Sequence, residues 1–265
     1  MSDPVMKLHR GRTPLLVSLP HIGQHVPADL HDALLPRALD VEDTDWHLDQ
    51  LYDFVRGLGA GLIVPHLSRY VIDLNRPSDN QPMYPGANNT ELCPTRSFTG
   101  DALYRDGMVP DAAEVARRTA RYWQPYHDTL GEELRCLKRE HGYAILLDGH
   151  SIRSELPWLF PGRLPDLNLG TANGTSCAPA LRDALATVLA AQTRYTHVVD
   201  GRFKGGYITR HYGQPHAGVH AVQLEKCWSC YMTEVPPFAW DAAQAASLRP
   251  VLRVFVEAAL AWRPA

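Results

Sequence analysis

The sequence lacks the features of several large protein classes. Its 265 residues include 26 Lys and Arg against 29 Asp and Glu, a net charge of −3. It therefore has no overall basic surplus of the kind that neutralises nucleic-acid phosphates. No uninterrupted apolar run approaches the roughly 20 residues that cross a bilayer. We expect neither nucleic acid nor a membrane among its partners.

Targeting and cross-linking features are also scarce. The first fourteen residues contain no apolar segment followed by a small-residue cleavage site, so they do not resemble a secretory signal. Five cysteines, an odd number in a chain long enough to bury its own core, do not indicate a disulfide framework. These observations predict a cytoplasmic protein. Cys227 and Cys230 can be a redox pair, half of a structural zinc site, or buried free thiols beside Trp228.

Short apolar runs alternate with helical patterns along the chain. The runs typical of strands lie at residues 14–20, 61–65, 69–75, 143–147, 196–199 and 219–225. The helical patterns lie at residues 43–59, 111–141, 176–192 and 241–262. Asp43 or Thr44 is expected to cap the first helix and Ser176 the third, with breaks or kinks at Pro125 and Pro250.

This alternation predicts one three-layer α/β/α domain over residues 1–265. The strands are expected to form a mixed, largely parallel sheet, because helices separate most of them. Residues 76–110 have little periodicity and are interpreted as a long irregular loop that forms a wall of the site. The site itself is expected outside the ends of the strands.

Histidines and carboxylates occur at the ends of the predicted strands. His21 follows the first run, His150 follows the run at 143–147, and Glu225 ends the run at 219–225. A catalytic zinc ion takes three nitrogen or oxygen ligands and keeps a position for water, and a separate carboxylate transfers the proton of that water. The sequence predicts Zn²⁺ bound by His21, Asp45 and His150, with Glu225 as the proton-transferring group.

The third metal ligand stays open between Asp45, Asp43 and Asp148. Asp43 can serve only as a helix cap, and Asp148 can orient a ligand histidine, because it lies two residues from His150 on the same strand face. Taken singly, each of these histidines is also typical of a hydrogen-bonded structural residue.

Six segments spread over much of the chain carry a resemblance to a known family. They are Ser18-Leu-Pro-His21-Ile-Gly23, Asp43-Thr-Asp45 with Leu51-Tyr52, Ser68-Arg-Tyr-Val-Ile-Asp-Leu-Asn-Arg-Pro77, Asp148-Gly-His150-Ser151, Gly201-Arg-Phe-Lys-Gly-Gly-Tyr-Ile-Thr-Arg210 and Gly218-Val-His-Ala-Val-Gln-Leu-Glu-Lys-Cys-Trp-Ser-Cys-Tyr-Met232. With these segments the chain resembles the N-formylglutamate amidohydrolases, also called N-formylglutamate deformylases. The resemblance implies a zinc-carboxypeptidase-like α/β/α fold of the phosphorylase/hydrolase-like type. It also implies zinc-dependent hydrolysis of N-formyl-L-glutamate, a small acidic N-acyl amino acid, to formate and L-glutamate at the end of a histidine-degradation route.

The sequence departs from the metal-binding pattern of the wider group that includes zinc carboxypeptidases and aspartoacylase. That group binds metal through a His-x-x-Glu pair and a later His. Here the position three after His21 is Gln24, and a neutral glutamine is a poor zinc ligand. The departure is the reason for assigning the carboxylate ligand to Asp45.

The resemblance also implies roles for three polar residues of the segment 68–77. Asn75 and Arg76 resemble the Asn-Arg pair that binds a substrate carboxylate, and the planar fork of guanidinium donors matches a carboxylate. Arg69 resembles the arginine that polarises the scissile carbonyl, although its spacing to the pair is one residue shorter than in aspartoacylase. A salt bridge is the alternative role for both arginines.

N-formylglutamate carries two carboxylates, so a second cationic group is expected. Arg202, Lys204 and Arg210 lie in a glycine-containing segment where backbone can approach a ligand closely. Any of them can bind the second carboxylate, with Arg210 favoured because it lies beside His211 and Tyr212. Such charges also commonly form a solvated loop.

Other functions fit parts of the sequence. A zinc deacylase or carboxypeptidase-like hydrolase acting on another N-acyl acidic amino acid is the main alternative. A serine hydrolase is disfavoured because no Gly-x-Ser-x-Gly segment follows a strand. A non-catalytic module that binds acidic metabolites is disfavoured by the joint presence of His21, His150 and Glu225. We expect a monomer or a small homo-oligomer.

Overall fold

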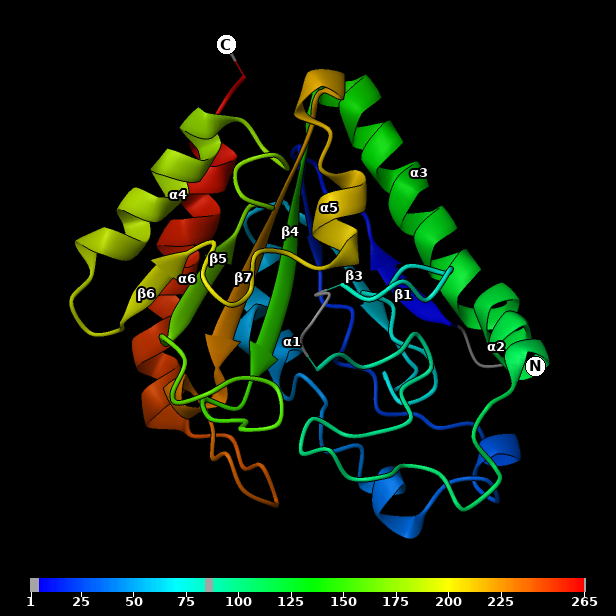
Figure 1. Cartoon of the computed structure of the whole chain (residues 1–265). Helices are drawn as coiled ribbons and strands as arrows, with labels where there is room; N and C mark the ends of the chain where they lie inside the picture. The colour runs from blue at the N-terminus through cyan, green and yellow to red at the C-terminus, as the bar shows by residue number, and fades with distance from the viewer. Residues whose placement is uncertain (1–4, 84–87, 265) are drawn as a thin grey trace.

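The computed structural model describes residues 5–83 and 88–264. These residues form one seven-stranded sheet with helices packed against it (Figure 1). The strand order is β1-β3-β2-β4-β7-β5-β6. β1 pairs antiparallel with β3, and β5 pairs antiparallel with β7, whereas the remaining neighbours are parallel. The prediction of a mixed, largely parallel sheet is confirmed. The strands are β1 (Met6–His9), β2 (Leu15–Ser18), β3 (Gly61–Pro65), β4 (Ala144–Ile152), β5 (Leu167–Gly170), β6 (His197–Val199) and β7 (Val219–Cys227).

Helices cover both faces of the sheet and complete the three predicted layers (Figure 1). α4 and α6 pack together on one face, and α3 packs on the other. Within residues 5–83 and 88–264, no helix combines the length and the apolar composition that crossing a membrane requires. The α-helices are α1 (Leu48–Leu51), α2 (Ala112–Arg118), α3 (Gln124–His141), α4 (Pro179–Ala191), α5 (Tyr207–Tyr212) and α6 (Ala242–Ala261). The other helical turns are η1 (Ala28–Leu30), η2 (Pro36–Asp40), η3 (Asp53–Val55), η4 (Thr119–Trp123), η5 (Pro215–Ala217) and η6 (Trp228–Cys230).

The central strands are buried on both faces, which explains their continuous apolar runs. Successive side chains of a strand point to opposite faces of a sheet. In β2, Leu15 and Val17 pack into the core that includes residues of α4 and α6, whereas Leu16 packs into the core that includes residues of α3. β2, β4 and β7 are neighbouring parallel strands, and their carboxyl ends carry the site residues.

The segment 69–75 is not the predicted strand but a series of turns. Its polar side chains bond to its own backbone: the Asp73 carboxylate accepts from the Asn75 amide (2.8 Å), and the Ser68 hydroxyl accepts from the Tyr70 amide (3.2 Å). Short polar side chains that bond locally in this way compete with strand pairing. The apolar residues Val71 and Ile72 that produced the strand pattern are buried within these turns.

Two predicted helix caps are also wrong. The helical pattern at 43–59 yields only α1 and η3, and His47 precedes α1. The Asp43 carboxylate instead accepts from the amide of Phe98 (2.7 Å), and the Thr44 hydroxyl donates to a carbonyl. Ser176 does not cap α4, because its hydroxyl donates to the Ala221 carbonyl (2.7 Å) on β7. Distant partners thus take the side chains of Asp43 and Ser176, and a carbonyl three residues earlier takes the hydroxyl of Thr44.

The two proline predictions have different outcomes. The helical pattern at 111–141 is broken where expected: α2 passes into the π-helical turn η4, and Pro125 occupies the first turn of α3. α6, by contrast, continues through Pro250 without a new start. The sequence patterns also missed the strands β1 and β5 and the short helix α5.

Candidate active site

The predicted site residues meet at the carboxyl ends of the parallel strands β2, β4 and β7. His150 and Glu225 are register partners on β4 and β7. His21 lies three residues after the end of β2, and the amide of Asp45 donates to its carbonyl (2.9 Å). All four side chains line one cavity, at the sheet edge where the carboxyl ends of these strands meet.

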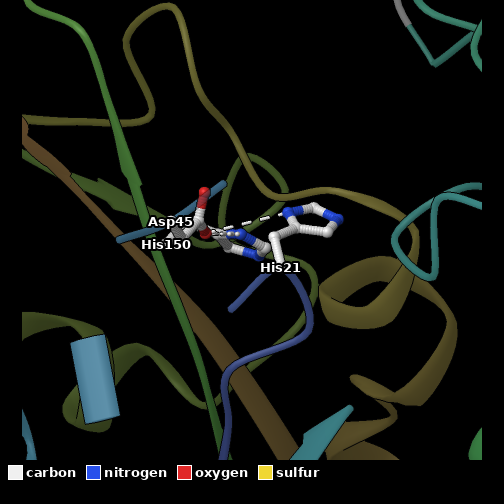
Figure 2. Close-up of side chains that lie close together, drawn as sticks. All are labelled: His21, Asp45 and His150. Carbon is white, nitrogen blue, oxygen red and sulfur yellow. Dashed lines mark hydrogen bonds and ion pairs between the residues drawn. The ribbon is translucent and has the colours of Figure 1, made fainter. Parts of the chain in front are cut away.

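His21, Asp45 and His150 form a buried cluster, with the Asp45 carboxylate facing both imidazoles (Figure 2). The Oδ2 atom of Asp45 lies 3.2 Å from Nδ1 of His150 and 3.7 Å from Nδ1 of His21. The prospective ligand atoms all lie within 4.8 Å of one another. Nδ1 of His21 is buried and has no hydrogen-bond partner among the described residues. This donor set can hold a metal ion.

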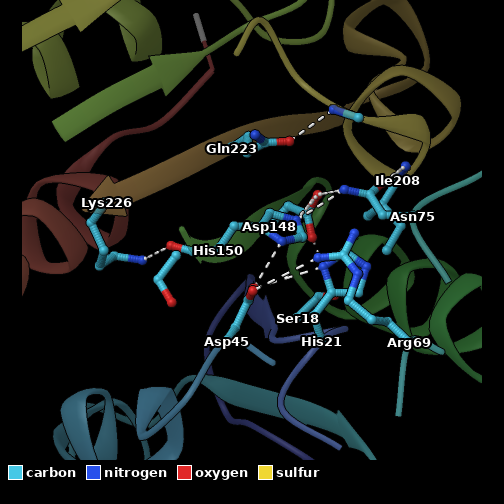
Figure 3. A network of polar contacts seen from close by, with 12 residues as sticks. Ser18, His21, Asp45, Arg69, Asn75, Asp148, His150, Ile208, Gln223 and Lys226 are labelled. Carbon is cyan, nitrogen blue, oxygen red and sulfur yellow. Dashed lines mark hydrogen bonds and ion pairs between the residues drawn. The ribbon is translucent and has the colours of Figure 1, made fainter. Parts of the chain in front are cut away.

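A second carboxylate contacts the far nitrogen of each histidine, and Figure 3 shows the one at His150, Asp148. Nε2 of His21 lies 2.7 Å from Oδ1 of Asp73, and Nε2 of His150 lies 3.0 Å from Oδ2 of Asp148. In the neutral imidazole that a metal ion requires, a carboxylate at Nε2 favours the tautomer in which Nε2 carries the proton, and this leaves the lone pair of Nδ1 for the metal. Asp148 thus has the orienting position that the sequence allowed for it. Asp73 was missed, because it was interpreted as part of a strand.

Burial and mutual contacts shift the pKa values of the cluster. Burial opposes a charge on His150, but Asp148 and Asp45 outweigh it and raise the pKa of His150 to about 10, so without a metal the imidazole carries a proton that metal binding would displace. Burial lowers the pKa of His21, and the charge of Arg69 acts in the same direction. Burial alone raises the pKa of Asp45, but the contacts with both histidines and Arg69 hold that pKa below its ordinary value. Asp45 is therefore ionised at neutral pH, as a metal ligand must be.

Glu225 lies beside the cluster but outside the group of prospective ligands. Its side chain is only 6% exposed, and its Oε1 atom has no hydrogen-bond partner in the described part of the chain. Burial raises the pKa of Glu225 to about 7, against the opposing effect of His150. A carboxyl group with a pKa near the working pH can both accept and donate a proton, as a general acid–base requires.

Arg69 brings a positive charge to the same cavity. Its Nη2 atom donates to Oδ2 of Asp73 (2.6 Å), and its Nη1 atom lies 4.0 Å from Oδ1 of Asp45. The guanidinium also lies 4.4 Å from the centre of the Phe98 ring. Asp73 therefore links the predicted carbonyl-polarising arginine to the metal-facing His21.

Asn75 and Arg76 line the cavity next to Arg69. The Asn75 amide nitrogen lies 3.0 Å from Nε2 of His150, and its oxygen accepts from the Ile208 amide (2.8 Å) at the start of α5 (Figure 3). The Arg76 guanidinium donates to the hydroxyl and the carbonyl of Thr90. The structure thus brings the predicted carboxylate-binding pair to the predicted metal cluster.

The two arginines considered for the second carboxylate lie in different places. Arg202 lines the cavity, and its Nη2 atom donates to the Leu159 carbonyl (3.2 Å). Arg210 is exposed on α5, donates to the Gly205 carbonyl (2.8 Å) and is not among the described residues that line the cavity. Gln24 is exposed.

Comparison with known proteins identifies the family of the chain. The family model described as N-formylglutamate amidohydrolase matches residues 13–232. The chain belongs to the N-formylglutamate amidohydrolase family. Two proteins named N-formylglutamate deformylase, from Pseudomonas aeruginosa and Pseudomonas putida, are 53% and 49% identical to it over 260 residues, which is 98% of this chain and 97% of each relative. The crystal structure of N-formylglutamate amidohydrolase from Ralstonia eutropha JMP134 is similar with a TM-score of 0.81 and 26% identity, covering 96% of this chain and 97% of that one.

The Cys-x-x-Cys pair of this N-formylglutamate amidohydrolase family member lies away from the cavity. Cys227 and Cys230 are buried free thiols whose Sγ atoms lie near backbone carbonyls of residues 164–166. Burial raises the pKa of both thiols. Reactive cysteines have lowered pKa values, so this environment favours packing over redox chemistry.

A buried histidine next to the site residues makes the stability of the fold depend on pH. His127 on α3 is 5% exposed, and its Nε2 atom donates to the Leu74 carbonyl (2.9 Å), next to Asn75. Burial lowers its pKa to about 3. Below about pH 6.5 this histidine binds a proton in the unfolded chain but stays neutral in the folded chain. His127 therefore lowers the free energy of unfolding progressively as the pH falls from about 6.5 to about 3.

We expect His127→Gln, which keeps an N–H donor, to lose less stability than the wild type between pH 7 and pH 5. The difference should be about 2 kcal/mol, from about 1.4 kcal/mol per pH unit below pH 6.5. Urea unfolding at both pH values, with a chelator present so that metal release does not contribute, measures it. His197→Gln, at an exposed position, is the matched control. Equal losses in the wild type and His127→Gln would contradict the prediction.

Proposed function

We propose that this protein is a zinc-dependent N-formylglutamate deformylase, which hydrolyses N-formyl-L-glutamate to formate and L-glutamate as the last step of a histidine-degradation route. The observation that carries the proposal is the convergence of a buried His21–Asp45–His150 cluster with the unpartnered carboxyl oxygen of Glu225 in one cavity. The names of the two Pseudomonas relatives support the substrate.

The cluster fits a zinc ion. The two Nδ1 atoms and an Asp45 oxygen would hold it, and the unpartnered Nδ1 of His21 is the atom that most needs such a partner. Asp45 is favoured over its two rivals, because Asp43 accepts from the Phe98 amide and Asp148 lies at the opposite nitrogen of His150. When bound, zinc acts as a Lewis acid that polarises a carbonyl and lowers the pKa of water to about 7.

Residues beside the cluster transfer the proton and stabilise the developing charge. Glu225 takes the proton of the attacking water and later returns it to the leaving nitrogen of glutamate. Arg69 stabilises the negative charge that develops on the formyl oxygen, since its buried guanidinium lies at the cluster. These two steps need no proton donor or acceptor other than Glu225.

Substrate recognition falls to cationic and amide side chains of the same cavity. Arg76, with Asn75 beside it, binds one carboxylate of the substrate, and Arg202 binds the second. Arg210 is the less favoured partner for the second carboxylate because of its exposed position on α5. We further propose that residues 1–265 act as one catalytic domain in the cytoplasm, as a monomer or a small homo-oligomer.

A substrate panel tests the proposed activity. We expect formate release from N-formyl-L-glutamate to exceed, in kcat/KM, the hydrolysis of N-formyl-L-aspartate, N-acetyl-L-glutamate and N-succinyl-L-glutamate. The physical reason is that the two arginines and the cluster have to engage both carboxylates and the formyl group together. A preference for the acetyl or succinyl compound would instead identify a different zinc deacylase.

Metal removal tests the proposed cofactor. Dialysis against a chelator should abolish formate release, and one equivalent of Zn²⁺ should restore it, with metal analysis giving about one ion per chain. Full activity in a preparation shown to be free of metal would overturn the zinc-dependent mechanism.

A further inference from the structure

The guanidinium of Arg76 is held by three hydrogen bonds, two of them to a single residue. Its Nε atom donates to the Thr90 carbonyl (3.0 Å), and its Nη2 atom donates to the Thr90 hydroxyl (3.0 Å). Its Nη1 atom donates to the Asn75 carbonyl (3.1 Å). Nη1 also lies 3.8 Å from Oδ2 of Asp73, which is an ion pair beyond hydrogen-bond distance. A guanidinium has five N–H donors in a fixed plane, so the three hydrogen bonds to described residues leave one N–H on Nη1 and one on Nη2 for a ligand.

The surroundings keep this arrangement at the cavity wall. Thr90 is 5% exposed, and both it and Arg76 line the cavity. The backbone of Arg76 is held independently, because the indole nitrogen of Trp123 donates to its carbonyl (2.9 Å). Thr90 therefore acts on the direction of the guanidinium, whereas Trp123 acts on the position of the main chain.

We propose that Thr90 is a specificity-determining positioning residue, which turns the Nη1–Nη2 edge of Arg76 toward a carboxylate of the substrate. The inference rests on the proposed function, in which Arg76 binds that carboxylate. Two parallel N–H groups recognise a carboxylate only when the plane of the guanidinium is correctly aimed. A carboxylate can bind either the Nε–Nη2 edge or the Nη1–Nη2 edge of a guanidinium. Because Thr90 accepts from Nε and from one N–H of Nη2, the first edge is occupied, and Arg76 is oriented before the substrate binds.

The side chain of Thr90 can be tested without disturbing its shape. Thr90→Val replaces the hydroxyl by a methyl group and removes one of the two acceptors, whereas Thr90→Ser keeps the hydroxyl. We expect Thr90→Val to raise KM for N-formyl-L-glutamate about tenfold with kcat changed less than about twofold, because a hydrogen bond to a charged group is lost. Thr90→Ser should restore KM to within about twofold of the wild type.

Two comparisons separate positioning from a general structural role. Thr95→Val removes a nearby hydroxyl that bonds to Glu91 rather than to Arg76, and it should leave KM unchanged. In an Arg76→Gln background, Thr90→Val should add no further increase in KM, since a residue that acts through Arg76 has no effect without it. An equal effect of Thr90→Val in both backgrounds, or a wild-type KM in Thr90→Val alone, would overturn the proposal.

Binding of glutarate keeps this test independent of turnover. Glutarate is a dicarboxylate without a scissile amide, and calorimetry should show about tenfold weaker binding to Thr90→Val than to the wild type and Thr90→Ser. If the wild type released no formate from N-formyl-L-glutamate, the proposed function would fail, and the glutarate comparison would still decide the role of Thr90. Equal affinities of all three proteins for glutarate would reject it.

Discussion

Glu225→Gln is expected to lower kcat for formate release by about 10²–10⁴-fold, the usual contribution of a positioned general acid–base. The amide has nearly the same shape as the carboxyl group but cannot take the proton of the attacking water. Because Glu225 lies outside the prospective ligand group, the metal content of the variant should equal that of the wild type. Steady-state kinetics and metal analysis of the same preparations measure both quantities.

The matched control for this change is Glu257→Gln on α6. Glu257 is an exposed glutamate that pairs with Arg253 (2.9 Å) and is not among the described residues that line the cavity, so its replacement should leave kcat unchanged. Unimpaired turnover by Glu225→Gln would remove Glu225 from the mechanism. Loss of the metal together with activity would make Glu225 a ligand instead of a proton-transfer group.

Asp45→Asn is expected to lose both the metal and more than about a hundredfold of the activity. Even the groups that only orient metal ligands are worth about 10–100-fold in affinity or activity, so a ligand itself should be worth more. Asp45 is the carboxylate that faces both imidazoles, and a neutral amide is a poor substitute for it (Figure 2). Metal analysis and formate release, measured with and without added Zn²⁺, test the assignment.

Two neighbouring aspartates serve as matched comparisons for Asp45. Asp148→Asn should weaken metal affinity by about 10–100-fold and recover activity in excess Zn²⁺, because Asp148 contacts the nitrogen of His150 that lies opposite the prospective metal ligand atom. Asp43→Asn should retain the metal, since burial already raises the pKa of Asp43 to about 6 and its carboxylate bonds to the Phe98 amide. If Asp43→Asn lost the metal while Asp45→Asn kept it, Asp43 and not Asp45 would be the carboxylate ligand.

The strands were predictable where their apolar runs result from burial on both faces of the sheet. The runs that became β2, β3, β4 and β7 are apolar because both faces of these strands are buried, and burial is recorded directly in residue type. The segment 69–75 shows the limit of this reasoning. Its buried Val71 and Ile72 resemble a strand, yet Asp73 and Ser68 bond to the local backbone and hold it in turns.

The site residues that the sequence predicts are metal-binding or ionisable side chains at the ends of apolar runs. His21, His150 and Glu225 were found because charged or metal-binding side chains directly after apolar runs are costly unless they are used. Asp73 carried no comparable signal, because its role depends on contacts with His21 and Arg69 that no local pattern contains. Thr90 is similar: a threonine in an irregular loop gains a role only through the guanidinium that it meets.

The layered α/β architecture, the chemical types of the prospective ligands and the resemblance to one family could be predicted from residue patterns alone, because burial periodicity and side-chain chemistry are local properties. The folded chain was needed to choose Asp45, which faces both Nδ1 atoms, over Asp43 and Asp148, and Arg202, which lines the cavity, over Arg210. These choices depend on the relative placement of segments that are distant along the chain. Such placement is set by the packing of the whole sheet and its helices, which no single stretch of residues encodes.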